Sequence, residues 1–259
     1  GLCAMINFHA VFQVWRRNFL VWRKLALPSL LGNVVDPVMA LMAFGLGLGS
    51  MLPNVGGMPY LNYLAVGAVC ISAMNAPTFE ALYSAFSRMH TQKTWQVIMN
   101  TPVRLREVVL GECSWAASKG LISTGAMLLI VALLGIGDVQ FWVLSWFVLI
   151  LACLMFAGFG LCINARAPSY DFFMFYFTLV VTPMTFLSGA FFPREQLPEW
   201  LRMVADYMPL SVVVDALRGI YARDFSMLPA LLVQMAVYAT VGIGLAIFLT
   251  ERRFKRKGA

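Results

Sequence analysis

Six apolar runs, each about twenty residues or longer, constrain the fold of this chain more than any other feature. They occupy residues 30–50, 60–84, 108–136, 140–164, 171–190 and 227–250. A helix of about twenty apolar residues crosses the roughly 30 Å hydrocarbon layer of a bilayer. Only 12% of the 259 residues are charged, against about 25% in an ordinary soluble domain. The chain is therefore expected to be an all-α membrane protein with six transmembrane helices.

The residues before the first run predict a separate amphipathic helix. Apolar residues recur at helical spacing between residues 6 and 27, whereas Gln13, Arg17 and Lys24 fall on the opposite face. The apolar set is Phe8, Val11, Phe12, Trp15, Phe19 and Trp22. Aromatic rings suit the headgroup boundary, and cations suit anionic lipid. We expect residues 1–27 to form an interfacial helix and residues 28–259 to form the membrane domain. A cytosolic amphipathic helix is the alternative.

Lysines and arginines predict the orientation in the membrane. Six spans place both termini on one side, and fourteen of the nineteen cations lie on that side. The positive-inside rule then puts both termini in the cytoplasm. These cations stand at the ends of apolar runs and form no continuous basic surface, so the formal charge of +7 predicts membrane orientation and no nucleic-acid partner.

The polar loop of residues 85–107 predicts a docking element on the cytoplasmic side. Apolar residues recur there at i, i+3 and i+4 beside two polar residues, which suits a groove on another protein. The residues concerned are Trp95, Ile98, Met99, Lys93 and Gln96. A helix lying on the lipid surface is the alternative.

Residues 191–225, after the fifth span, predict an outer hairpin of two short helices. Pro209 separates two helical patterns, neither of which is long enough to span. Such paired helices are usually re-entrant and packed against protein, with a hairpin on the membrane surface as the alternative. The residues that mark the hairpin are Phe191, Phe192, Pro193, Trp200 and Pro209.

Charges within or near the apolar runs need partners, because desolvation of a lone charge is costly. They are Asp36, Glu80, Glu112 and Lys119. Glu112 and Lys119 lie seven residues apart on one face of the third span, and the sequence leaves open whether they pair. An ion relay in a secondary transporter is one alternative, and a lipid-modifying enzyme with Asp36 or Glu80 as its catalytic carboxylate is another. The histidines and cysteines have no spacing that predicts a metal site, and no catalytic set is recognisable.

The aromatic residues of the fifth span predict a path for cargo. Phe172, Phe175 and Tyr176 recur at i, i+3 and i+4, and Phe173 with Phe177 forms the other face. Only about one helical face can border a pathway. The alternative is that most of these rings contact lipid or a second subunit.

Several motifs together resemble a known family. They are FEALYSAFSRM followed by KTWQVIMNTPV, then GECSWAASKG, FLSGAFFPREQLPEWL and MPLSVVVDALR. Their order and spacing resemble the type 2 ATP-binding-cassette permeases, and within these the nodulation-factor export (NodJ) branch. The resemblance implies a homodimer in a bacterial inner membrane, with each subunit resting on a cytoplasmic ATPase through a coupling helix. It also implies export of a lipid-linked or hydrophobic glycoconjugate, with drug or antibiotic efflux as the alternative cargo.

The sequence also agrees with that resemblance in lacking an ATP-binding motif of its own. The sequence contains no G-x-x-x-x-G-K-[ST] motif, and the glycine-rich residues 45–49 lack the lysine that would meet phosphates. We therefore expect no cofactor in this chain, with ATP and magnesium bound by a partner ATPase.

Overall fold

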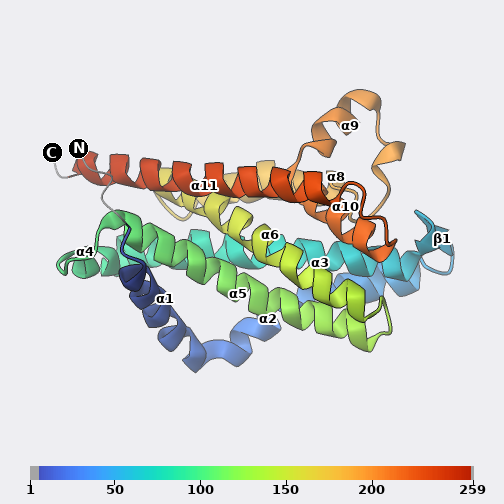
Figure 1. Cartoon of the computed structure of the whole chain (residues 1–259), viewed down its shortest axis with the longest axis horizontal. Helices are drawn as coiled ribbons and strands as arrows, with labels where there is room; N and C mark the ends of the chain where they lie inside the picture. The colour runs from blue at the N-terminus through green and yellow to red at the C-terminus, as the bar shows by residue number, and fades with distance from the viewer. Residues whose placement is uncertain (1–5, 258–259) are drawn as a thin grey trace.

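The computed structural model describes residues 6–257, which fold into a bundle of long helices (Figure 1). The long helices are α2 (Ala26–Gly47), α3 (Tyr60–Phe79), α5 (Leu105–Leu133), α6 (Val139–Arg166) and α11 (Leu228–Lys257). The shorter ones are α1 (Phe8–Trp22), α4 (Thr94–Met99), α7 (Phe172–Tyr176), α8 (Thr182–Leu187), α9 (Glu199–Asp206) and α10 (Pro209–Tyr221). Three π-helical segments extend or join them, at Glu80–Ser84, Ser87–Thr91 and Phe177–Val181. Two 3-10 turns lie at Arg23–Leu25 and Arg194–Gln196.

Within the described residues, five helical stretches are long and apolar enough to cross a membrane. They are Phe8–Gly47, Tyr60–Thr91, Leu105–Leu133, Val139–Arg166 and Leu228–Arg256. The predicted fifth run corresponds to a shorter apolar helical stretch, Phe172–Leu187. The chain is thus an all-helical, multi-pass membrane protein, as the apolar runs predicted.

α3 lies at the centre of the bundle, where it contacts α2, α5, α6 and α10. Small residues along it allow the neighbours to approach closely, which is a common basis of helix packing in membranes. At Gly67 the backbone carbonyl of Ala190 lies so near that an added Cβ would stand 2.4 Å from its oxygen. Substitution of Gly67 would therefore push the end of the fifth apolar segment away from α3.

A β-hairpin closes the loop between α2 and α3. β1 (Asn54–Val55) pairs antiparallel with β2 (Met58–Pro59). The two residues between them, Gly56 and Gly57, have φ angles of 59° and 78°. Positive φ at both central positions is what a tight two-residue hairpin turn requires.

α1 and α2 form one helical stretch that is interrupted only by the 3-10 turn at Arg23–Leu25. Asn7 caps α1 by accepting hydrogen bonds from the backbone of His9 and Ala10. The aromatic side of α1 packs partly on α5, because Trp15, Phe19 and Trp22 surround the Trp115 ring. Residues 1–5 of the predicted interfacial segment lie outside the described residues.

The two halves of the predicted outer hairpin differ from each other. α10 is buried along most of its length and packs on α3, α6 and α11. α9 stands away from the bundle at one end (Figure 1), with Trp200 and Tyr207 about two-thirds or more exposed. Pro209 is the first residue of α10, where its missing N–H leaves no helical hydrogen bond unmade.

Candidate transport and coupling sites

A groove over α3 is the first candidate site. It has a volume of about 190 Å³ and lies between α2 and the end of the fifth apolar segment. Its lining residues are Asp36, Pro37, Ala40, Leu41, Leu64, Ala68, Ile71, Asn75, Thr185, Ala190 and Phe191. The walls are therefore largely apolar, and Asp36, Asn75 and Thr185 are the polar groups of the groove.

The burial of Asp36 differs from the prediction made from the sequence. Asp36 was predicted to be a buried charge, but its side chain is exposed on the surface of the single chain. It lies near the middle of α2, beside Pro37, where the helix faces the groove. An ionisable residue at membrane depth is a mark of a functional site, because lipid does not solvate its charge.

The aromatic rings of the fifth segment also divide differently from the prediction. Phe175 is 63% exposed and Phe172 is half-buried, whereas Tyr176 is buried within the chain. Tyr176 therefore does not share an open face with the other two rings in the single chain, and the cargo path along this segment stays a prediction. The π-helical segment Phe177–Val181 follows directly and shifts the helical faces by an additional residue.

Four charges form a cluster at the base of α3 and α5, which we call the base cluster: Glu80, Arg88, Glu112 and Lys119. Lys119 donates to Glu80 at 2.7 Å, and Arg88 bridges Glu80 at 2.9 Å and Glu112 at 2.6 Å. The two carboxylates are only 3% and 1% exposed. Two indoles complete it, since Trp115 donates to Glu80 and Trp95 donates to Glu112. The charges of this cluster compensate one another.

The base cluster shows that Glu112 and Lys119, whose pairing the sequence left open, each have a different partner. Lys119 pairs with Glu80, and Glu112 pairs with Arg88. Arg88 and Trp115 were not among the predicted site residues. The signal that could have found Arg88 is the number of carboxylates, because two buried acids and one lysine leave one negative charge in need of a nearby cation. This signal does not point to Trp115, whose indole is neutral.

The predicted docking patch is wrong at Trp95. Its side chain is 1% exposed, stacks on Phe254 of α11 and donates to Glu112. Ile98 and Met99 are partly buried against the core. The exposed side of α4 consists of Gln96 and Val97, with Lys93 just before the helix. The side of α4 that a partner can reach is thus that of Lys93, Gln96 and Val97, and not that of Trp95, Ile98 and Met99.

A cavity of about 520 Å³ lies beside the base cluster. It is bordered by α1, by α5 and by the helical extension of α3. Its lining includes Arg17, Trp22, Tyr83, Arg88, Trp115 and Lys119. The base cluster is therefore reached from one side through a hollow whose lining is both cationic and aromatic.

A second cluster holds the C-terminal end of the fifth segment, and we call it the outer cluster after the predicted outer hairpin: Arg194, Asp206, Asp215 and Arg218. Arg194 donates to Asp206 at 2.9 Å, to Asp215 at 2.6 Å and to the Ser188 carbonyl at 2.9 Å. Arg218 donates to the Gly189 carbonyl and lies 3.6 Å from the centre of the Tyr63 ring. The two arginines thus fix the chain where it leaves α8. Gly189, with a φ of 86°, makes the turn possible.

The chain thus combines five long apolar helical stretches, a shorter apolar helix and a groove between α2, α3 and the fifth segment. Residues 9–222 match the model of the ABC-2 type transporter family, and the chain belongs to this family. Nodulation protein J of Rhizobium leguminosarum bv. trifolii is 45% identical over 80% of this chain and 79% of its own. Nodulation protein J of Bradyrhizobium diazoefficiens is 42% identical over 94% and 93%. The inner membrane transport permease YadH of Escherichia coli is 21% identical over 81% of each chain.

Family membership settles the class of activity. ABC-2 type permeases form the transmembrane part of a transporter and pair with an ATP-binding-cassette ATPase, which hydrolyses ATP. This chain is therefore a transport subunit, and the alternative of a lipid-modifying enzyme is set aside. In agreement, both oxygens of Glu80 are occupied by cations and an indole.

Proposed function

We propose that this chain is the permease subunit of an exporter that moves a lipid-linked oligosaccharide, or a similar amphipathic glycoconjugate, outward across the bacterial inner membrane. The groove over α3 carries the proposal. Apolar walls suit an acyl chain, and Asp36, Asn75 and Thr185 suit the hydroxyl and amide groups of a saccharide. The name of one relative, an inner membrane transport permease, supports transport and the inner membrane as the location.

Two copies of the chain would enclose the groove. The flanking helices expose apolar side chains on either side of it: Val35, Met39 and Met42 on α2, and Phe175, Leu179 and Phe186 on the fifth segment. If a second copy covers these faces, Asp36 lies in the interior of a homodimer, away from lipid. We therefore propose a homodimer of six-span subunits in which Phe172–Leu187 is the additional span.

The proposed topology has both termini in the cytoplasm, and reporter fusions test it. Fusions after Pro53, Gly137 and Glu199 should report the outside, and fusions after Thr91 and Ala167 should report the cytoplasm. A cytoplasmic report after Glu199 would contradict the six-span arrangement.

The coupling element is proposed to be residues 85–107, with the exposed side of α4 against the ATPase. A carboxylate in place of Val97, which is 64% exposed, should weaken capture of the ATPase without changing the thermal stability of the permease. Trp95→Ala should lower stability, because it removes a buried ring and leaves Glu112 short of a donor. Normal capture by the Val97→Asp variant would show that this side of α4 does not dock.

The cargo proposal is tested with the permease and its ATPase in proteoliposomes. Asp36→Asn should lower export of a fluorescent lipo-chitooligosaccharide about tenfold, because a hydrogen bond to a charged group contributes about 1.5–3 kcal/mol. Basal ATP hydrolysis should stay unchanged. Asp171→Asn is the matched control, since Asp171 is an exposed carboxylate outside the groove.

Two results would change the proposal. Transport of a lipophilic dye but not of the saccharide would favour drug efflux by the same machinery. Equal saccharide export by wild type, Asp36→Asn and Asp171→Asn would remove the groove from the transport path.

A further inference from the structure

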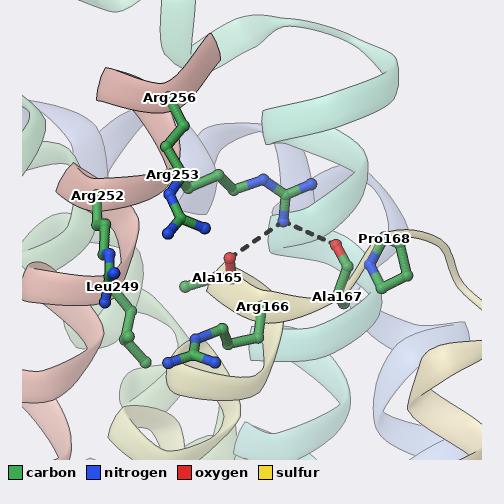
Figure 2. Close-up of a pocket in the computed structure, with 8 residues that line it drawn as sticks. All are labelled: Ala165, Arg166, Ala167, Pro168, Leu249, Arg252, Arg253 and Arg256. Carbon is green, nitrogen blue, oxygen red and sulfur yellow. Dashed lines mark hydrogen bonds between the residues drawn. The ribbon is translucent and has the colours of Figure 1, made fainter.

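The ends of α6 and α11 enclose a pocket of about 410 Å³ that lies outside the groove and the base cluster (Figure 2). Four arginines line it: Arg166, Arg252, Arg253 and Arg256. The other lining residues are Ala165, Ala167, Pro168 and Leu249. We call it the arginine pocket. It combines a strongly cationic lining with a small apolar floor, and no carboxylate is among the described residues that line it.

Arg253 has a structural task in this pocket. Its guanidinium donates to the carbonyls of Asn164, Ala165 and Ala167 at 3.0, 3.3 and 2.8 Å, two of which are drawn in Figure 2. These carbonyls stand at the C-terminal end of α6, where a helix lacks its own donors and carries partial negative charge. Arg253 therefore joins α11 to α6 and shields an incoming anion from the carbonyl ends.

Among the described residues, the other three arginines have no anionic partner. Within residues 6–256, no carboxylate lies within ion-pair distance of Arg166, Arg252 or Arg256. Arg252 and Arg256 are four residues apart on one helical face, where like charges repel each other. Arg166 reaches the same hollow from α6 (Figure 2). Solvated arginines that served only membrane orientation would not need to converge from two helices on one hollow.

We infer that the arginine pocket binds a phosphate group, with Arg166, Arg252 and Arg256 as its ligands. Guanidinium groups match phosphate oxygens in paired hydrogen bonds, which makes arginine the preferred residue for this anion. The phosphate belongs to the headgroup of an anionic lipid or to a soluble phosphate compound. The position at the basic ends of two spanning helices brings lipid headgroups within reach, and Leu249 and Pro168 offer contact to the first part of an acyl chain. The inference depends on the proposed orientation, with both termini in the cytoplasm, only for deciding which leaflet supplies the lipid.

The test uses the full-length permease, purified with its ATPase and placed in nanodiscs. Native mass spectrometry measures retained phosphatidylglycerol and cardiolipin against a phosphatidylcholine background. The variant is Arg252→Gln combined with Arg256→Gln, and Arg253 is left intact. The matched control is Lys24→Gln combined with Lys255→Gln, which removes the same charge from exposed positions outside the pocket. A second arm titrates inorganic pyrophosphate in discs of phosphatidylcholine alone.

The expected result is that the arginine variant loses lipid retention by roughly fivefold for each arginine removed, and the control retains it. Pyrophosphate binding that depends on Arg252 and Arg256, without lipid retention, would keep the phosphate site and assign it to a soluble ligand. Equal retention and equal pyrophosphate binding by wild type, variant and control would overturn the inference. Unchanged phosphate and lipid binding with loss of ATPase capture would also overturn it, because the arginines would then be a protein contact.

Discussion

The base cluster and the outer cluster contain the same groups, two cations and two carboxylates, but they differ in their access to water. Glu80 and Glu112 of the base cluster are 3% and 1% exposed, whereas Asp206 and Asp215 of the outer cluster are 41% and 38% exposed. Water already hydrates the carboxylates of the outer cluster and can replace a lost partner there, whereas the carboxylates of the base cluster are almost closed to water although a cavity borders the cluster. The base is therefore the fixed end of the bundle, and the outer end is where rearrangement costs least.

The largest effect on stability should follow from Glu112→Ala. This change leaves Arg88 with one carboxylate and the buried Trp95 indole without an acceptor. We expect the free energy of unfolding to fall by about 3–5 kcal/mol. Thermal unfolding of the detergent-purified protein measures it. Glu251→Gln is the control, because its exposed ion pair with Arg106 should contribute no more than about 1 kcal/mol. Similar losses in the two variants would contradict the contrast between buried and exposed pairs.

The second largest effect is the interaction free energy between Glu80 and Lys119 in the base cluster, measured by a double-mutant cycle. Glu80→Gln and Lys119→Met should each destabilise the protein, and the double variant should recover at least about 0.5–1 kcal/mol of the summed loss, since the two groups are 2.7 Å apart. Lys119→Met combined with Glu251→Gln should instead be additive. Additive losses for Glu80 and Lys119 would show that the ion pair contributes nothing beyond its separate members.

A smaller effect is expected at the outer cluster. Arg194→Ala removes donors to two carboxylates and to the Ser188 carbonyl. Because both carboxylates are partly hydrated already, we expect a loss of only about 1–2 kcal/mol. Hydrogen exchange should rise in residues 188–210 and stay unchanged in α5. Arg202→Ala, which removes an exposed contact 3.8 Å from Asp206, is the control and should leave both measurements unchanged. A rise in exchange across α5 would mean that the two ends are not independent.

The smallest effect should be found at Asp138, which caps α6 and forms an exposed ion pair with Arg223. The Phe141 backbone N–H and Arg223 lower the pKa of this carboxyl below its ordinary value of 3.8. A lowered pKa means that the stabilisation is present above pH 3.8 and is lost as the pH falls further. Asp138→Asn should therefore give a small decrease in melting temperature at pH 7 that shrinks as the pH falls below about 3.8 and disappears once the carboxyl of the folded protein is protonated. A decrease that persists unchanged at lower pH would contradict the role of the charge.

Long apolar runs predicted most of the fold, because a helix in lipid must satisfy its own backbone and so shows its length in the sequence. The run at 140–164 corresponds to α6, Val139–Arg166, within two residues at either end. The run at 171–190 did not reveal the π-helical turn within it, since that turn depends on packing and not on hydropathy.

The candidate sites were predicted less well than the fold. Periodicity placed Trp95 on an apolar face, but it could not show that this face turns inward toward α5 and α11. Glu80 and Arg88 are eight residues apart, which in a regular α-helix places them about 80° apart around the axis. The π-helical segments between them are not visible in the pattern, so the pair was missed.

α11 is one uninterrupted helix of 30 residues, which makes it about 45 Å long. Its basic end holds Phe254, stacked on Trp95, and its other half packs along α10. A stiff helix of this length can transmit a movement imposed at one end to the other end. A tilt of a few degrees imposed through α4 would displace the far end by several ångströms without breaking a single helical hydrogen bond. If the ATPase docks at α4 as proposed, its movement would reach the opposite end of the bundle as a mechanical displacement of α11.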